Sequence, residues 1–290
     1  MKKITVTELK EMKNNSVKIT ALTAYDVQTA RLLDQAGIEL ILVGDSLGMV
    51  VLGYENTLPV TMEEMLHHTK AVTRGVQRAL VIADLPFMSY QTGVKETLIN
   101  ASRFLKEAQA NGVKLEGGRR IIKQVRALVE TGIPVMGHLG LTPQSVLQLG
   151  GFRVQGRAED QAEQLLIEAK ELERAGVFSL VLECLPADLA RKISESLKIP
   201  TIGIGAGVDC DGQILVVQDL LGMNTDFQPK FVRRYANLEE VIKKAILGYL
   251  TDVRGEKFPN LEESFQHLKT SDQTQLYSGG DDQDADSEDD

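Results

Sequence analysis

The chain contains 290 residues, of which 43% are hydrophobic and 5% aromatic, and its formal net charge is −9. This length is enough for one large domain, and α/β barrels commonly reach it undivided. Residues 271–290 hold eight of the 41 acidic residues and no Lys or Arg, so the remainder has 33 acids against 32 bases. A body so close to neutral excludes the basic surface that binds nucleic acid or membranes.

The N-terminus and the cysteines indicate where in the cell the protein is expected, and the composition of the C-terminal residues indicates where its domain ends. The N-terminus lacks an apolar signal region, and no long uncharged apolar stretch occurs. Cys184 and Cys210 lack metal-type spacing and are expected to be reduced thiols. We therefore expect a soluble, cytoplasmic protein with one catalytic domain over residues 1–269. A disordered acidic tail is predicted over residues 270–290, whose single Leu and single Tyr supply too little apolar surface to fold.

One unit recurs along the chain from residue 18 to residue 221: an amphipathic helix, a glycine, a short apolar strand and a polar residue at the strand's end. Glycines suited to a left-handed helix C′ position are expected to end four helices: Gly37, Gly112, Gly132 and Gly176. Eight strands are predicted over residues 18–23, 39–44, 79–83, 113–116, 133–137, 178–182, 201–204 and 213–217. Their alternation with helices favours a closed (β/α)₈ TIM barrel over a doubly wound open sheet.

The connections and the C-terminal region complete this prediction. The longest connections, residues 46–59 and 139–158, both follow the C-terminal ends of strands, where barrels carry their active sites. Beyond the last strand we expect a helix over residues 237–252 and a further short helix over 258–269.

Ionisable side chains stand at the ends of five consecutive predicted strands: Asp45, Asp84, Lys114 with Glu116, His138, and Glu183. Since side chains alternate along a strand, Lys114 shares a face with Glu116, and Asp45 shares one with Val43. The helices need an apolar surface to pack on, and Val113 and Leu115 supply it. Lys114 and Glu116 are therefore expected to point into the barrel mouth, and the others can do likewise.

Four carboxylates at one mouth would repel one another unless a positive group lay among them. Carboxylate oxygens suit a hard divalent cation, and Mg²⁺ typically takes one or two carboxylates and completes its shell with water or substrate. Our hypothesis is that Asp45 and Asp84 bind Mg²⁺, with Glu116 in or beside its coordination shell.

Each of these residues also has a structural interpretation. Asp45 or Asp84 alone could be a helix N-cap in a βα loop, and Lys114 could extend to solvent from a strand end. His138 is as compatible with a structural role as with a functional one. Glu183 lies between apolar neighbours, and a carboxylate in such surroundings suits a general base.

Two further motifs point to structure rather than chemistry. The stretch Gly203-Ile204-Gly205-Ala206-Gly207 lacks dinucleotide-binding spacing, so a tight turn is favoured over a phosphate site. His67 and His68 are adjacent on a predicted helix and could not present both rings to one site.

Eight stretches in order resemble the ketopantoate (3-methyl-2-oxobutanoate) hydroxymethyltransferase family, and together they span about residues 4–268. They are Thr20-Ala21 with Tyr25-Asp26, Gly44-Asp45-Ser46-Leu47-Gly48, Thr57-Leu58-Pro59-Val60-Thr61, Ala83-Asp84-Leu85-Pro86-Phe87, Lys114-Leu115-Glu116-Gly117-Gly118, Gly137-His138-Leu139-Gly140-Leu141-Thr142-Pro143-Gln144, Glu183-Cys184 and Gly203-Ile204-Gly205-Ala206-Gly207. No motif position departs from the family pattern, and the acidic tail falls outside it.

The resemblance implies a barrel of the phosphoenolpyruvate/pyruvate superfamily that depends on Mg²⁺, one ion per subunit. The implied reaction moves a hydroxymethyl group from 5,10-methylenetetrahydrofolate to 3-methyl-2-oxobutanoate through a magnesium-stabilised enolate. Its product is 2-dehydropantoate, a precursor in pantothenate and coenzyme A biosynthesis. The resemblance also implies a homo-oligomer, often a decamer, with no nucleic acid or membrane partner.

Site roles follow from the same resemblance. It implies metal binding by Asp45, Asp84 and Glu116. It implies contacts to the substrate from Asp45, Ser46, Asp84 and Lys114. Glu183 would be the proton acceptor, and His138 would have a supporting role.

Two alternatives stay open. A magnesium-dependent 2-keto acid C–C lyase of the same superfamily would share the enolate chemistry. Such lyases share a Lys-Lys-Cys-Gly-His motif that contains a catalytic cysteine, and this motif is absent here. A non-catalytic ligand-binding barrel would be expected to have lost one or more of Asp45, Asp84, Lys114 and Glu183, and none is replaced.

Overall fold

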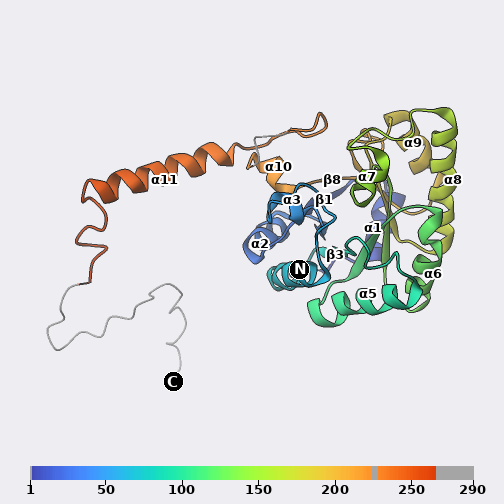
Figure 1. The fold of residues 1–290 in the computed structure, drawn as a ribbon, viewed down its shortest axis with the longest axis horizontal. Helices are drawn as coiled ribbons and strands as arrows, with labels where there is room; N and C mark the ends of the chain where they lie inside the picture. Colours follow the sequence, from blue (N-terminus) through green and yellow to red (C-terminus); the bar gives the residue numbers. More distant parts are fainter. Residues whose placement is uncertain (1, 224–227, 266–290) are drawn as a thin grey trace, which may run out of the picture. The chain divides into compact units, whose positions relative to one another are not determined.

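The computed structural model describes residues 2–223 and 228–265. Within them, eight parallel strands form a closed barrel in which β1 pairs with both β2 and β8 (Figure 1). The strands are β1 Ile19–Thr23, β2 Leu40–Val43, β3 Leu80–Asp84, β4 Gly112–Glu116, β5 Val135–Gly140, β6 Ser179–Glu183, β7 Thr201–Ile204 and β8 Gly212–Leu215. The predicted TIM barrel is confirmed.

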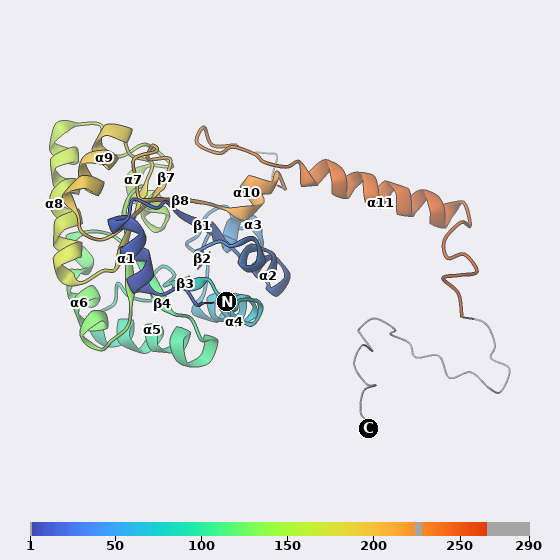
Figure 2. The same cartoon turned by 180° about the vertical axis from the view of Figure 1, so that it is seen from behind.

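Helices surround the barrel. They are α1 Val6–Asn14, α2 Val27–Ala36, α3 Leu47–Val50, α4 Met62–Gly75, α5 Val94–Ala108, α6 Ile122–Glu130, α7 Val146–Leu149, α8 Glu159–Ala175, α9 Ala187–Ser196 and α10 Val217–Leu221, with 3₁₀ turns at Arg119–Ile121 and Pro143–Ser145. Seen from behind, α8 and α9 lie on the opposite side from α2 and α4 (Figure 2). The regular alternation stops between β7 and β8, which are joined by a turn without a helix.

Helix ends follow local sequence signals. Capping boxes pair Thr5 with Glu8 and Thr61 with Glu64 at the starts of α1 and α4. The predicted left-handed glycines are found after α2, α6 and α8. The prediction for Gly112 is wrong, because α5 ends earlier and Gly112 begins β4, where an added Cβ would lie 2.6 Å from the Pro134 carbonyl oxygen.

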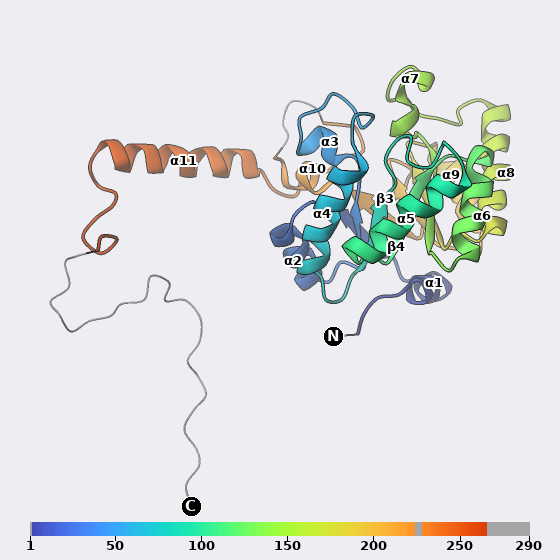
Figure 3. The same ribbon diagram turned by 60° about the horizontal axis from the view of Figure 1, so that its bottom comes forward.

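The apolar core has two layers because neighbouring strand residues face opposite sides of the sheet. The barrel interior holds the cluster Ile19, Ala21, Leu40, Leu42, Leu80, Ile82, Met136, Val181, Ile202 and Ile214. Leu9 of α1 is fully buried in this cluster, so α1 closes the end of the barrel opposite α3 and α7 (Figure 3). The outer layer, which includes Val43 and Val113, packs against the helices.

The C-terminal region forms a separate unit. Residues up to 239 form one compact unit, and residues from 240 belong to a second. The helix predicted over residues 237–252 is confirmed as α11, Leu238–Arg254. The short helix predicted from residue 258 is wrong as far as residue 265: Pro259 has no N–H to donate, and the Asn260 side chain accepts the N–H groups of Glu262 and Glu263 in a turn. Residues 266–269 and the predicted tail lie outside the described residues.

None of the described helices is long and apolar enough to cross a membrane.

Candidate active site

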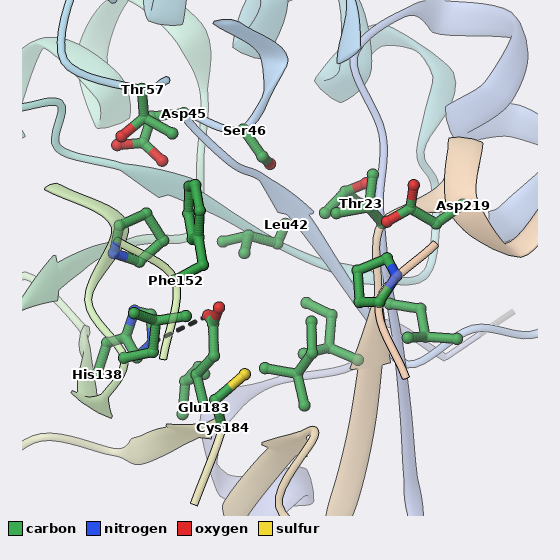
Figure 4. Close-up of a pocket in the computed structure, with 18 of the residues that line it drawn as sticks. Thr23, Leu42, Asp45, Ser46, Thr57, His138, Phe152, Glu183, Cys184 and Asp219 are labelled. Atoms are coloured by element: carbon green, nitrogen blue, oxygen red, sulfur yellow. Dashed lines mark ion pairs between the residues drawn. The ribbon is translucent and has the colours of Figure 1, made fainter. Parts of the chain in front are cut away.

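A cavity of about 430 Å³ opens at the C-terminal ends of the strands. Its lining includes every site residue predicted from the sequence: Asp45, Ser46, Asp84, Lys114, Glu116, His138 and Glu183. Figure 4 shows several of these side chains facing one another, with His138 directed at Glu183. The barrel therefore brings together residues that are more than a hundred positions apart in the sequence.

The register between neighbouring strands places four of these side chains at similar heights along the barrel. Asp84 is paired in register with Lys114, and Glu116 with His138, across neighbouring strands. Glu183 ends β6 beside Gly140 of β5. A side chain at Gly140 would collide with the Glu183 carbonyl oxygen, and the residue has a left-handed φ of 99°, so glycine is required for this close approach.

Asp45 reaches the mouth by a different route from the predicted one. Val43 packs in the outer layer against the helices, so alternation would also turn Asp45 outward. Instead β2 ends at Val43 and the chain turns at Gly44, where a Cβ would lie only 2.7 Å from Ser46 Oγ. The turn lets the Asp45 N–H donate to Asp84 Oδ2 at 3.2 Å. Ser46 Oγ lies 2.8 Å from the Tyr25 hydroxyl.

Lys114 is the buried cation among these acids. Its Nζ lies 2.7 Å from Asp84 Oδ1 and 3.7 Å from Glu116 Oε1, and only 3% of its side chain is exposed. Burial alone would lower the pKa of Lys114, but the neighbouring carboxylates outweigh burial and raise it. The ammonium group is therefore positively charged at neutral pH and suited to bind an anionic ligand.

His138 lies between two carboxylates. Its Nδ1 is 3.4 Å from Glu116 Oε1 and its Nε2 is 3.3 Å from Glu183 Oε2. Burial and Lys114 would lower the pKa of His138, but its contacts with Glu116 and Glu183 raise it to about 9. The imidazolium therefore lies within ion-pair distance of Glu183 at the edge of the cluster. Glu183 is also the most accessible of these groups, with 16% of its side chain exposed to the cavity.

The acid cluster has the chemistry of a magnesium site. Burial, together with the charges of Asp84 and Glu116, raises the pKa of Asp45 well above its usual range, which indicates a deficit of positive charge. Burial also raises the pKa of Asp84, against the effect of Lys114. Two neighbouring carboxylates that face a cavity match the small protein ligand set that Mg²⁺ accepts. The residues therefore fit this ion.

Glu116 has a different environment from the two aspartates. Burial would raise its pKa, but His138 and Lys114 outweigh burial and lower it. Its Oε2 accepts the Gln144 backbone N–H at 3.0 Å, and its Oε1 faces His138. Among the described residues, no three His, Cys, Asp or Glu side chains converge as a ready metal cage. The Glu116 carboxylate is therefore held by Gln144 and His138.

Comparison with known proteins identifies the family. A family model described as ketopantoate hydroxymethyltransferase matches residues 3–261. The chain belongs to this family. A relative named 3-methyl-2-oxobutanoate hydroxymethyltransferase, from Moorella thermoacetica, is 59% identical over 264 residues, which cover 91% of this chain and 98% of the relative. A relative of the same name from Syntrophus aciditrophicus is 58% identical, with 91% and 97% covered.

More distant solved structures share the fold of this ketopantoate hydroxymethyltransferase family member. A phosphoenolpyruvate phosphomutase from Streptomyces platensis subsp. rosaceus superposes with a TM-score of 0.58 at 14% identity, covering 90% of this chain and 92% of that one. A 2,3-dimethylmalate lyase of the PEP mutase/isocitrate lyase superfamily gives 0.58 at 16% identity, covering 89% and 91%. These likenesses show that the chain shares their fold.

Sequence reasoning gave no role to Gln144, which the fold places at the centre of the site. Gln144 Nε2 donates to Asp45 Oδ2 at 2.9 Å and to the Leu85 carbonyl at 2.9 Å. Since its backbone N–H also donates to Glu116, one residue holds two of the acids. The available signals were its place in the long loop after the fifth strand and at the end of the family stretch that begins at Gly137.

Tyr90 fixes the other end of this amide. Its hydroxyl donates to Gln144 Oε1 at 2.7 Å, and the Glu116 backbone N–H donates to the Tyr90 hydroxyl at 3.2 Å. Tyr90 is 1% exposed. No sequence pattern distinguishes this tyrosine from an ordinary core residue.

Proposed function

We propose that this barrel transfers a hydroxymethyl group to 3-methyl-2-oxobutanoate and so produces 2-dehydropantoate for pantothenate biosynthesis. The observation that carries the proposal is the pairing of a buried ammonium, Lys114, with an accessible carboxylate, Glu183, in one cavity of a chain that belongs to this family. A cation can hold the acid group of a keto acid while a carboxylate removes its C3 proton.

We further propose that 5,10-methylenetetrahydrofolate supplies the carbon and that Asp45 and Asp84 hold Mg²⁺, with Glu116 beside it. Magnesium, when bound, would act as a Lewis acid on the keto carbonyl and make the adjacent C3–H more acidic. The crowding of buried carboxylates around a single lysine supports this assignment.

The protein's own groups would act in sequence. Lys114 and Ser46 bind the substrate carboxylate, and the Glu183 carboxylate then takes the C3 proton, leaving an enolate. His138 holds Glu183 in position. A new C–C bond forms between C3 and the methylene carbon of the folate, and both bonds from that carbon to the folate nitrogens break. One water supplies the hydroxyl group of the product. The C3 proton and the remaining hydrogen of that water protonate the two nitrogens, which gives tetrahydrofolate.

The lyase alternative requires a reactive cysteine at the mouth, and the candidate is Cys184. Burial, with the nearby Glu183 charge, raises the pKa of Cys184 to about 12. A thiol that stays protonated at neutral pH is a poor acid or nucleophile. This observation favours the transferase.

The test uses purified protein, 3-methyl-2-oxobutanoate, Mg²⁺ and 5,10-methylenetetrahydrofolate, with EDTA in a parallel reaction. We expect 2-dehydropantoate only without chelator. In D₂O without the folate, we expect exchange of the C3 proton, since the enolate forms before the donor reacts. Cleavage of a 2-keto acid such as 2-dehydropantoate without folate would favour the lyase, and absence of both exchange and product would refute catalysis.

Self-association is a further part of the proposal. The exposed apolar residues of α11 support it: Val241, Ile242, Ile246, Leu247, Tyr249 and Val253. Helix α11 buries none of its residues within the described chain. Light scattering should give a homo-oligomer, and Ile246→Glu with Leu247→Glu should reduce its mass; a monomeric wild-type protein would contradict the proposal.

A further inference from the structure

The cavity has a second side that the keto acid chemistry leaves unused. The acid cluster occupies the ends of β2 to β6, whereas the lining from β7, β8 and the residues that follow is mostly apolar and includes Ile204, Ile214, Leu215 and Phe231, with Lys230 as its cation. A volume of about 430 Å³ falls in the range of pockets that enclose drug-sized ligands. A small branched keto acid fills only part of it.

One carboxylate stands on this apolar side, that of Asp219 in α10. Asp219 lines the cavity and is partly buried. In Figure 4 its carboxylate points toward Thr23, on the opposite side of the view from His138. Thr23 Oγ accepts the Val217 N–H at 3.1 Å, which fixes the start of α10 against the end of β1. Asp219 is therefore held by the fold in a set position relative to the cavity.

The surroundings of Asp219 favour binding of a planar ring whose edge carries N–H hydrogen-bond donors. Most side chains on this side of the cavity are apolar, and a carboxylate in such a wall gains most from a ligand that offers it paired N–H groups. Burial raises the pKa of Asp219, while the positive charge of Arg234 opposes this and favours the ionised form. A pyrimidinone ring bearing an amino group next to a ring N–H presents that pair of donors.

We propose that Asp219 recognises the amino-pyrimidinone edge of the reduced pterin in the folate donor, whose ring would lie in the apolar half of the cavity. This rests on the proposed function, in which a folate is the donor. Bound this way, the ring would place its methylene-bearing nitrogens toward the middle of the cavity, between Asp219 and Glu183.

The outer rim agrees with this orientation. Arg153 and Lys230 are exposed residues of the cavity lining, and Phe152 is a half-exposed aromatic that lies on the same side of the view as His138 in Figure 4. The far end of a folate carries a benzoyl ring and a glutamate with two carboxylates. Aromatic and cationic groups at the rim match those two parts.

The test measures binding of 5-formyltetrahydrofolate, a stable folate, and of its 2-desamino analogue to wild-type protein and to Asp219→Asn. We expect Asp219→Asn to weaken binding of 5-formyltetrahydrofolate by about 10- to 100-fold, as expected for loss of a charged hydrogen bond. Wild-type protein should bind the analogue about as weakly. The variant should bind the two folates with similar affinity, which would show that Asp219 and the amino group interact.

Solvent exchange at C3 separates this inference from the proposed function. Asp219→Asn should still exchange the C3 proton of 3-methyl-2-oxobutanoate, since the donor takes no part in that step, and retained exchange also shows that the variant is folded. Asp209→Asn, an exposed change outside the cavity lining, is the matched control and should leave every measurement unchanged. The inference would be overturned if removal of the amino group from the folate lowered its affinity equally for wild-type protein and for Asp219→Asn. It would also be overturned if the variant bound 5-formyltetrahydrofolate as tightly as wild-type protein does. Absence of exchange in wild-type protein would instead count against the proposed function.

Discussion

The two halves of the barrel mouth differ in what their side chains do. On one side, from β2 to β6, Asp45, Asp84, Lys114 and Glu116 are each at most 6% exposed and contact one another. On the other side, around β7, β8 and α10, the cavity wall is mostly apolar, with Asp219, Thr23 and Lys230 as polar groups. One cavity therefore combines a charged side with a mostly apolar side, and we propose that the first serves proton transfer and the second binds the flat ring of the donor.

The contrast has a physical basis in the strands themselves. Along β3 the inward side chains run from Leu80 and Ile82 to Asp84, so apolar packing supports the charged end from below. β7 and β8 are short, and no helix separates them. The residues at their ends that line the cavity are Ile204 and Leu215, which carry no ionisable group. Variants on each side should separate the two activities.

The largest effect is expected from Glu183→Gln. Removing a positioned general base lowers rates by about 10²- to 10⁴-fold, so both C3 exchange and product formation should fall by that factor. Binding of 5-formyltetrahydrofolate should be unchanged, because the donor half is intact. NMR of the C3 position in D₂O gives the exchange rate, and exchange near the wild-type rate would refute the role of Glu183.

Asp84→Asn should act on the metal rather than on the donor. We expect Mg²⁺ affinity to fall by about 100-fold or more, since loss of a direct ligand should exceed the 10- to 100-fold cost of changing an outer partner. Lys114 also loses its nearest counterion. Isothermal titration with Mg²⁺ alone measures this, with Asp209→Asn as control, and wild-type affinity in Asp84→Asn would exclude Asp84 as a ligand.

Gln144→Met should have a smaller effect on the same half. The substitution keeps the size of the side chain but removes its hydrogen bonds to Asp45 and Tyr90. We expect Mg²⁺ affinity to fall by about 10- to 100-fold. Gln148→Met, at an exposed position of α7 whose side chain accepts a hydrogen bond from Arg120 outside the cavity lining, is the matched control. A fall in thermal stability with unchanged Mg²⁺ affinity would assign Gln144 to packing alone.

The smallest effect concerns Cys184, which lies where the two halves meet. Because the pKa of Cys184 is raised to about 12, its thiolate is scarce until the pH approaches that value. At pH 9, alkylation by iodoacetamide should be about tenfold or more slower in the folded protein than in the denatured chain. Peptide mass mapping distinguishes it from Cys210, and equal rates in the two states would contradict the raised pKa.

Much of the fold could be predicted because its signals are local. Apolar runs, helix caps and glycines such as Gly37 and Gly176 act within a few residues, and they predicted the order of all eight strands. The ends of those strands then identified Asp84, Lys114, His138 and Glu183 as neighbours, since parallel strands in a barrel bring their C-terminal ends to one face. Gly112 shows the limit, because its role depends on the Pro134 carbonyl of the adjacent strand.

The sequence by itself determined the barrel, the family and the list of ionisable groups at its mouth. Only the tertiary structure decided how those groups are held. Gln144 reaches Asp45 across 99 positions of sequence, and the turn at Gly44 rather than strand alternation directs Asp45 inward. The bond from Val217 to Thr23 spans 194 positions and sets where Asp219 stands. Periodicity fixes the face on which a side chain lies, but a hydrogen bond between distant segments depends on where closure of the barrel brings both of them.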